Sequence, residues 1–213
     1  MSNNDFPAIA ARQAQRDRAI AEREAREAQS RAAGEAQDAR RRAHARADAA
    51  ARAVLAGGRR VDPLIAKLRH AFVEATFVEP VVTVHWLTPG TRSTELIGPR
   101  NGSAFYATRR IVTEAIVDHA TAAGALHELG HLREPGGPKL TREVHAWKWA
   151  IRHAPTWTNG MQAELVRCVA TYVEAAGRAD VLGVVAAEQF IRWATTESFR
   201  KREQQFQRAR RAS

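Results

Sequence analysis

The feature that most constrains the fold is a long stretch near the start of the chain that has no proline and few large apolar side chains. Residues 8–56 consist mainly of Ala, Arg, Glu and Gln, which are all strong helix formers. Gly34 is the only weak point inside the stretch. We therefore expect one long helix here, and a hydrophobic core that comes from the rest of the chain.

Alanines recur along this stretch close to every 3.5 residues, at Ala11, Ala14, Ala21, Ala25, Ala28, Ala32 and Ala39. Such a repeat is typical of a coiled-coil seam or of a helix that lies on a partner. Because alanine buries little area, the seam would be weak, and a solvated single helix is the alternative. The pattern leaves open a protein partner or a homodimer through residues 8–56.

The net charge of +10 belongs to the two ends of the chain. Residues 1–60 hold 13 Arg and 8 acidic residues, residues 200–213 hold six Lys or Arg and one Glu, and residues 61–199 hold 14 residues of each sign. The ends therefore predict at most weak, salt-dependent nucleic-acid binding. The neutral middle gives no sign of a nucleic-acid enzyme.

Length and composition favour a soluble globular protein. A chain of 213 residues with 45% hydrophobic residues suits one domain with extensions. Cys168 is the only cysteine, so an internal disulfide is excluded. The apolar runs are too short to cross a bilayer, and the N-terminus lacks a secretory signal. We expect a cytoplasmic protein that does not contact membranes.

The elements after residue 56 are predicted from turn and cap signals. Gly57-Gly58 indicates a linker, and Asp62-Pro63 is typical of a helix start. The apolar face of that helix would be formed by Leu64, Ile65, Leu68 and Phe72. Strands are expected within residues 80–90, 95–98 and 103–119, with a hairpin turn at Asn101-Gly102.

From residue 120 onward the sequence predicts helices, with breaks near residues 135–138, 155–160 and 177. The order of elements predicts an α+β fold that is mostly helical and contains a small antiparallel sheet. The predicted domains are a helical extension over 1–58, a domain over 59–199 and a basic helical tail over 200–213.

Residues 125–133, ALHELGHLR, carry the most specific chemical signal. On a helix, His127 and His131 share one face and can bind one metal ion, and nitrogen ligands suit Zn²⁺. Glu128 lies about 100° round the helix, where it can reach a water at the metal. The metal would acidify this water and polarise a carbonyl. Glu128, as general base, would pass the proton to the leaving amine, which predicts a zinc peptidase.

Two features argue against an exposed helix with chance histidines. Its other side carries Leu126, Leu129 and Leu132, which indicates that the helix is packed. Gly130 costs about 1 kcal/mol of helix propensity relative to Ala, which indicates the close approach of another backbone. The preceding strand, expected over 110–118, would supply the edge on which a peptidase aligns its substrate.

A third metal ligand must come from another segment. The turn at 135–138 would end the first helix, and Thr141 can cap a second helix that returns antiparallel. Glu143 would then lie in the first turn of the second helix, level with His131. The rival ligands are His145, Glu134, His153 and Glu164.

HELGH followed by EVHAWKWA resembles the zinc metallopeptidases of the ImmA/IrrE type, among the gluzincin-like HExxH enzymes. The residues that match their Glu-x-x-Ala-x-x-aromatic-Ala pattern are Glu143, Ala146, Trp149 and Ala150. The resemblance covers roughly residues 61–152 and implies a zincin-like core. It also implies that His127, His131 and Glu143 bind Zn²⁺ and that Glu128 is the general base.

Two questions stay open at this level. The donor that stabilises a developing oxyanion has several candidates by proximity in the chain, which are Tyr106, Arg109, His119, His145 and His153. The alternative function is a non-catalytic zinc-binding assembly or interaction protein of a phage or mobile element, associated with nucleic acid through its basic ends.

Overall fold

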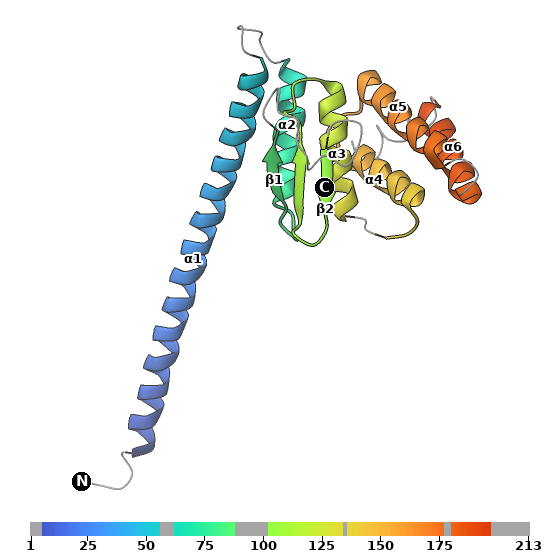
Figure 1. Cartoon of the computed structure of the whole chain (residues 1–213). Helices are drawn as coiled ribbons and strands as arrows, with labels where there is room; N and C mark the ends of the chain where they lie inside the picture. Colours follow the sequence, from blue (N-terminus) through green and yellow to red (C-terminus); the bar gives the residue numbers. More distant parts are fainter. Residues whose placement is uncertain (1–5, 56–61, 88–101, 134–135, 177–179, 197–213) are drawn as a thin grey trace. The chain divides into compact units, whose positions relative to one another are not determined.

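The structure, a computed structural model, describes residues 6–55, 62–87, 102–133, 136–176 and 180–196 (Figure 1). Helix α1 runs without interruption from Phe6 to Val54, which confirms the long helix predicted over residues 8–56. The contacts divide the chain into two units, Met1–Ala43 and His44–Ser213. The predicted linker at Gly57-Gly58 lies outside the described residues.

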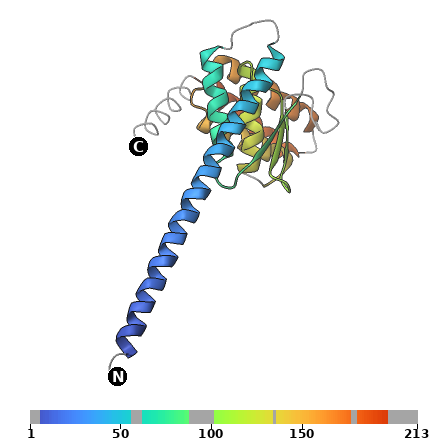
Figure 2. The same cartoon turned by 90° about the vertical axis from the view of Figure 1, so that its left-hand side faces the viewer.

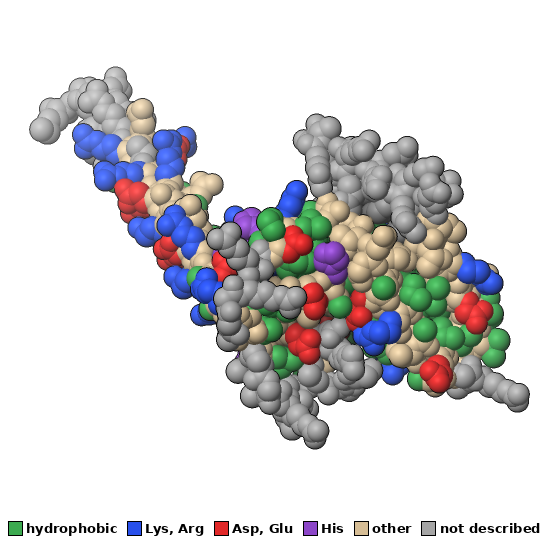
Figure 3. Space-filling model, turned by 90° about the horizontal axis from the view of Figure 1, so that it is seen from above, with side chains coloured by type: hydrophobic (Ala, Val, Ile, Leu, Met, Phe, Trp, Pro, Cys, Tyr) green, Lys and Arg blue, Asp and Glu red, His purple; other side chains and the backbone are tan. Residues whose placement is uncertain are grey.

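The described part of the first unit is the portion of α1 that ends at Ala43. Every described side chain between Gln15 and Asp38 is exposed, and Figure 3 shows basic and acidic side chains interleaved along the helix. The pair Arg23–Glu27, with 2.8 Å between Nε and Oε1, joins successive turns. Such i,i+4 pairs support an isolated helix by a few tenths of a kcal/mol each. Pairing of α1 with a partner stays a prediction.

Helix α2 (Pro63–Thr76) begins as its sequence predicts. The Asp62 side chain accepts a hydrogen bond from the backbone N–H of Leu64 at 2.8 Å, and proline occupies the first helical position. The cap satisfies one of the free N–H groups at the helix start. The predicted apolar face is largely confirmed, because Ile65, Leu68 and Phe72 are all buried.

The last turns of α1 pack against α2 (Figure 2). His44 of α1 pairs with Glu74, whereas Asp48, one turn later, pairs with Arg69. As the residue number rises along α1 it falls along α2, so the two helices run antiparallel. Ala47 of α1 is buried at this contact.

The sheet has three described strands, β1 (Thr83–Trp86), β2 (Gly102–Phe105) and β3 (Arg110–Thr113). Their order is β1-β3-β2, with β1 parallel and β2 antiparallel to β3. The sheet is therefore mixed, and the prediction of an antiparallel sheet was wrong. A four-residue turn joins β2 to β3 as a hairpin, but β1 lies on the other edge of β3. The fifteen residues 87–101 give the chain enough length to reach the far edge.

The predictions for residues 95–98, 101–102 and 110–118 differ in part from the structure. The strand expected over residues 95–98 lies outside the described residues. Asn101 does too, whereas Gly102 is the first residue of β2 and was wrongly placed in a turn. The expected strand 110–118 is shorter than predicted, because β3 ends at Thr113.

Four helices follow the sheet, with breaks where prolines and glycines predict them: α3 (His119–Arg133), α4 (Lys139–His153), α5 (Asn159–Ala176) and α6 (Val181–Thr195). Helix α3 is the central element, in contact with α2, β2, β3, α4 and α5 (Figure 1). Nearly every residue from Thr121 to His131 is buried, as expected for a helix that is covered all round. The described fold is α+β and mostly helical, as predicted.

Helix α4 starts earlier than predicted. Its N-cap is Pro138, which has no side chain that can cap the helix, and Lys139 is the first helical residue. Thr141 lies inside the helix, so its prediction as the cap was wrong. A proline has its φ already close to the helical value, which allows the helix to begin at once. Glu143 consequently lies in the second turn and not in the first.

None of the helices in the described part of the chain is long and apolar enough to span a bilayer.

Candidate metal centre

Two histidines of α3 and one glutamate of α4 converge in the interior. The Nε2 atoms of His127 and His131 lie 3.1 and 3.3 Å from the same oxygen, Oε2 of Glu143. All three residues are buried, with 4%, 9% and 6% of their surface exposed. Three ligand atoms that meet at one point inside a protein form a group that could hold a metal ion.

Glu143 reaches the histidines because α4 lies very close to α3. A Cβ atom on Gly130 would overlap the carbonyl oxygen of Ala146 and lie 2.9 Å from its Cα. The expected close approach of another backbone at Gly130 is therefore confirmed. Ala146 follows Glu143 by almost one turn, so the contact places Glu143 beside the α3 histidines.

The histidine ring of His127 is held by an aromatic neighbour. It stacks on the indole of Trp147, with ring centroids 4.3 Å apart and planes 8° from parallel. Trp147 lies one residue after Ala146 on α4 and is fully buried. The same helix therefore supplies the close contact, the carboxylate and the surface that orients one imidazole.

Several polar atoms of this group are left without a hydrogen bond. Within the described residues, Nε2 of His127, Oε2 of Glu143 and Nδ1 of His131 are buried and have no hydrogen-bond partner. Of these, Nε2 of His127 and Oε2 of Glu143 lie 3.1 Å apart without forming a hydrogen bond. Burying unpaired polar atoms is costly. A cation bound by the two imidazoles and the carboxylate would satisfy the first two atoms, so the residues fit a metal of the zinc type.

The negative charge of Glu143 and the positive charge of a protonated histidine stabilise each other. Burial raises the pKa of Glu143, but the contacts with His127 and His131 outweigh it and lower this pKa to about 2. Burial lowers the pKa of His131, but the Glu143 carboxylate outweighs it and raises this pKa. In the metal-free protein the carboxylate thus favours a proton on the imidazole. A metal ion would have to displace this proton, as is usual for histidine ligands.

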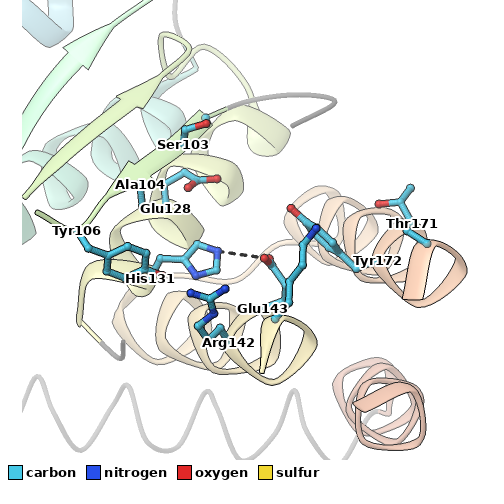
Figure 4. Close-up of a pocket in the computed structure, with 12 residues that line it drawn as sticks. Ser103, Ala104, Tyr106, Glu128, His131, Arg142, Glu143, Thr171 and Tyr172 are labelled. Atoms are coloured by element: carbon cyan, nitrogen blue, oxygen red, sulfur yellow. Dashed lines mark ion pairs between the residues drawn. The ribbon is translucent and has the colours of Figure 1, made fainter. Parts of the chain in front are cut away.

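Glu128 lies next to the group but does not belong to it. Its Oε1 is 4.0 Å from Nδ1 of His127, and 12% of its side chain is exposed. Burial raises its pKa, and the two histidines only partly counteract this effect. A Cβ atom on Gly102 of β2 would lie 2.6 Å from Cγ of Glu128. The side chain is therefore confined beneath the strand, where its carboxylate faces the same space as His131 (Figure 4).

A pocket of about 400 Å³ opens beside the group. Strand β2 forms one wall, and α3, α4 and α5 form the others (Figure 4). The residues that line it are Gly102, Ser103, Ala104, Tyr106, Glu128, His131, Lys139, Arg142, Glu143, Thr171, Tyr172 and Ala175. Both Glu128 and the exposed edge of His131 are thus accessible to a molecule in the pocket.

The rival ligands lie elsewhere. The His153 ring contacts the carbonyl oxygen of Trp149 at 2.8 Å, and Glu164 pairs with Arg167 on α5. His145 is not part of the metal-competent group, and Glu134 lies outside the described residues. The structure thus brings Glu143, and none of its described rivals, to the two histidines.

Of the residues expected to face an oxyanion, Tyr106 is the one that lines the pocket. His119 instead contacts the hydroxyl of Thr158 at 3.0 Å. Arg142 and Tyr172, which sequence reasoning missed, also line the pocket. Arg142 directly precedes Glu143, but nothing in the sequence distinguishes Tyr172 from the apolar Val169 and Val173 near it on the same helix.

Strand β3 is not the free edge that the sequence led us to expect. Strand β3 is paired on both sides, so its backbone groups are already used within the sheet. Strand β2 lines the pocket and forms an edge of the described sheet. The edge next to Glu128 is therefore β2.

Comparisons with family models, with curated proteins and with solved structures give no match to this chain.

Proposed function

We propose that this protein is a zinc-dependent peptidase that hydrolyses peptide bonds of a protein substrate, similar in its site to the ImmA/IrrE-type enzymes. The observation that carries the proposal is the convergence of His127, His131 and Glu143 on one point beside a pocket. A purely structural metal site would not need an open pocket and an additional carboxylate, Glu128, beside it.

The roles follow from position and charge. His127, His131 and Glu143 would hold the ion, and a bound zinc ion supplies Lewis-acid chemistry that acidifies water and polarises a carbonyl. Glu128 accepts a proton from the attacking water and delivers it to the leaving amine. The raised pKa of Glu128 suits this role, because the carboxylate must hold the proton from water before it donates it to the amine.

Tyr106 is the proposed donor to the developing oxyanion. Burial raises the pKa of its phenol, although Arg142 counteracts this effect. The hydroxyl therefore stays protonated at neutral pH and can donate a hydrogen bond. It lines the same pocket as His131 and Glu143 (Figure 4), where charge would develop on a substrate carbonyl.

Strand β2 is the proposed platform for the substrate. An extended peptide can add to a sheet edge through backbone hydrogen bonds, and β2 is an edge of the described sheet. Because Ser103 and Ala104 of this strand line the pocket together with Glu128, a peptide laid along β2 would pass the proposed base.

The test combines metal analysis with proteolysis of fluorescently labelled, denatured casein. We expect one tightly bound zinc ion per chain in the wild type and the loss of this ion in His127→Ala and Glu143→Ala. Glu128→Gln should keep zinc but lose hydrolysis by several orders of magnitude, whereas Tyr106→Phe should lower kcat by about 10²-fold or more. The control is His85→Ala, which replaces an exposed histidine on β1. It should change neither the zinc content nor the rate of hydrolysis.

Three outcomes would contradict parts of this proposal. Unchanged zinc in Glu143→Ala would remove this residue from the ligands. Full hydrolysis in Glu128→Gln would remove the proposed base. A third outcome is that every variant except the ligand variants binds zinc, but the wild type shows no hydrolysis. This outcome would instead favour a non-catalytic zinc-binding assembly protein. The exposed surface of α1 would then be its proposed partner-binding element.

A further inference from the structure

A second group of metal-competent side chains lies where α1 packs on α2. It consists of His44 on α1 and of His70 and Glu74 on α2, whose potential ligand atoms all lie within 4.8 Å of one another. Nε2 of His44 is 2.7 Å from Oε1 of Glu74. The two imidazoles stack with their centroids 4.3 Å apart. This second histidine–glutamate group is separate from the pocket described above.

The antiparallel packing of the two helices creates the group. His70 and Glu74 are four residues apart and therefore lie on one face of α2. The pair Asp48–Arg69, with 2.8 Å between Oδ1 and NH2, fixes α1 against that face one turn away. The buried Ala47 allows the close approach, which brings His44 next to Glu74.

We propose that His44, His70 and Glu74 form a second binding site for a divalent transition-metal ion of the zinc class. Two imidazoles and one carboxylate are a donor set that zinc accepts, with water at the remaining position. An ion pair would need only His44 and Glu74, so a third donor within reach of both is the feature that points to a metal.

The surroundings favour a cation at this place. Glu74 lies in the last turn of α2, where the free carbonyl groups make the helix end partly negative. The nearby positive charge of Arg69 is already compensated by Asp48. The side chains of His44 and Glu74 are 25% and 43% exposed, so a bound ion would keep contact with solvent. We expect weaker binding here than at the buried group of α3 and α4.

The function of such an ion would be to join the end of α1 to the domain that contains α2. It would replace the single hydrogen-bonded contact between His44 and Glu74 by bonds from three side chains on both helices. Binding to the folded state alone raises stability in proportion to the logarithm of the ion concentration. The prediction does not depend on the peptidase function.

The test is a zinc titration of the full-length protein after removal of metal with a chelator. Isothermal calorimetry should give two binding steps in the wild type. His127→Ala should remove the tighter step and keep the weaker one. His70→Ala and Glu74→Gln should each remove the weaker step and keep the tighter one. His85→Ala, outside both groups, is the control and should keep both steps.

Cobalt substitution provides a second readout. In the His127→Ala background, Co²⁺ should give the absorption of a histidine–carboxylate site, and Glu74→Gln should abolish it. Glu74→Gln preserves the size of the side chain and its ability to accept a hydrogen bond, so the fold should survive, as circular dichroism would verify. Two results would overturn the proposal. One is a weaker binding step that persists in both His70→Ala and Glu74→Gln. The other is a wild type that shows only the binding step that is lost in His127→Ala.

Discussion

Gly130 of α3 and Ala146 of α4 touch backbone to backbone, and their contact determines how far apart the two helices with the candidate metal ligands lie. Neither residue has a side chain that could act in chemistry. Each nevertheless lies close in sequence to residues that could, since His131 follows Gly130 and Glu143 precedes Ala146 by three positions. The distance between the helices therefore decides whether the carboxylate reaches the imidazoles.

Gly130→Ala should push the helices apart. The added methyl group has no space beside the Ala146 backbone, and overpacking of this kind costs about 1–3 kcal/mol. We expect a lower free energy of unfolding in urea, measured with chelator present, and a zinc affinity reduced about tenfold or more. Gly34→Ala is the matched control, because nothing lies within 4 Å of that position on α1. It should leave zinc affinity unchanged and gain up to about 1 kcal/mol of helix stability.

Trp147 should affect zinc binding through the orientation of His127. Trp147→Phe keeps an aromatic face against the imidazole and should alter zinc affinity only a few-fold. Trp147→Leu removes this face and should weaken zinc about tenfold or more. The control is Trp149→Leu, since Trp149 stacks in the same way on His153, away from the metal group. Equal zinc affinities for the two leucine variants would contradict the orienting role of Trp147.

The Cys168 thiol should be unreactive in the folded protein. Burial, followed by the charge of Glu164, raises its pKa from 9.0 to about 12. At pH 8 its thiolate fraction is then about a thousandfold smaller than in the unfolded chain, and thiolate is the reactive form. We expect alkylation by iodoacetamide to be slower by a comparable factor than in urea. Glu164→Gln, which removes the negative charge, should accelerate it.

The same shift in pKa predicts an effect of pH on stability. The folded protein holds the thiol proton more tightly than the unfolded chain. The stability from this group is therefore complete below pH 9 and decreases as the pH rises from about 9 to about 12. Cys168→Ala should lack this part of the decrease. A thiol that reacts equally fast in the folded and unfolded states would contradict both expectations.

Much of the fold could be predicted because the decisive signals are local. Asp62-Pro63 starts α2 through a cap that involves neighbouring residues alone, and the helix breaks coincide with prolines and glycines. The sheet could not be predicted in the same way. Which side of β3 receives β1 depends on contacts between strands far apart in the sequence, and no local pattern encodes this choice.

In the candidate site, too, the local features could be predicted from the sequence and the long-range contacts could not. The spacing of His127 and His131 places both on one helical face in any packed helix. Gly130 indicated the close approach of another backbone, but only the structure shows that this backbone belongs to the helix of Glu143. The pocket walls come from four separate elements. A tyrosine on an apolar stripe looks the same in the sequence whether its ring fills the core or its hydroxyl faces a pocket, so Tyr172 was missed.

Gly102 should control the position of the proposed base without affecting the metal ligands. A methyl group there would collide with Cγ of Glu128 and with the carbonyl oxygen of Val112. Because the Val112 backbone belongs to the central strand and cannot easily move, the Glu128 side chain has to shift. We expect Gly102→Ala to lower kcat by about 10²-fold, since a displacement of about 1 Å has an effect of this size.

Zinc content separates this effect from general damage. Gly102→Ala should bind as much zinc as Glu128→Gln, because the atoms nearest to the new methyl group belong to Glu128 and Val112 and not to the proposed ligands. Its KM should change little. The combination Gly102→Ala with Glu128→Gln should be no less active than Glu128→Gln alone, because both changes act on one group. A further loss of activity in the double variant would show that Gly102 acts through the β2 platform and not through Glu128.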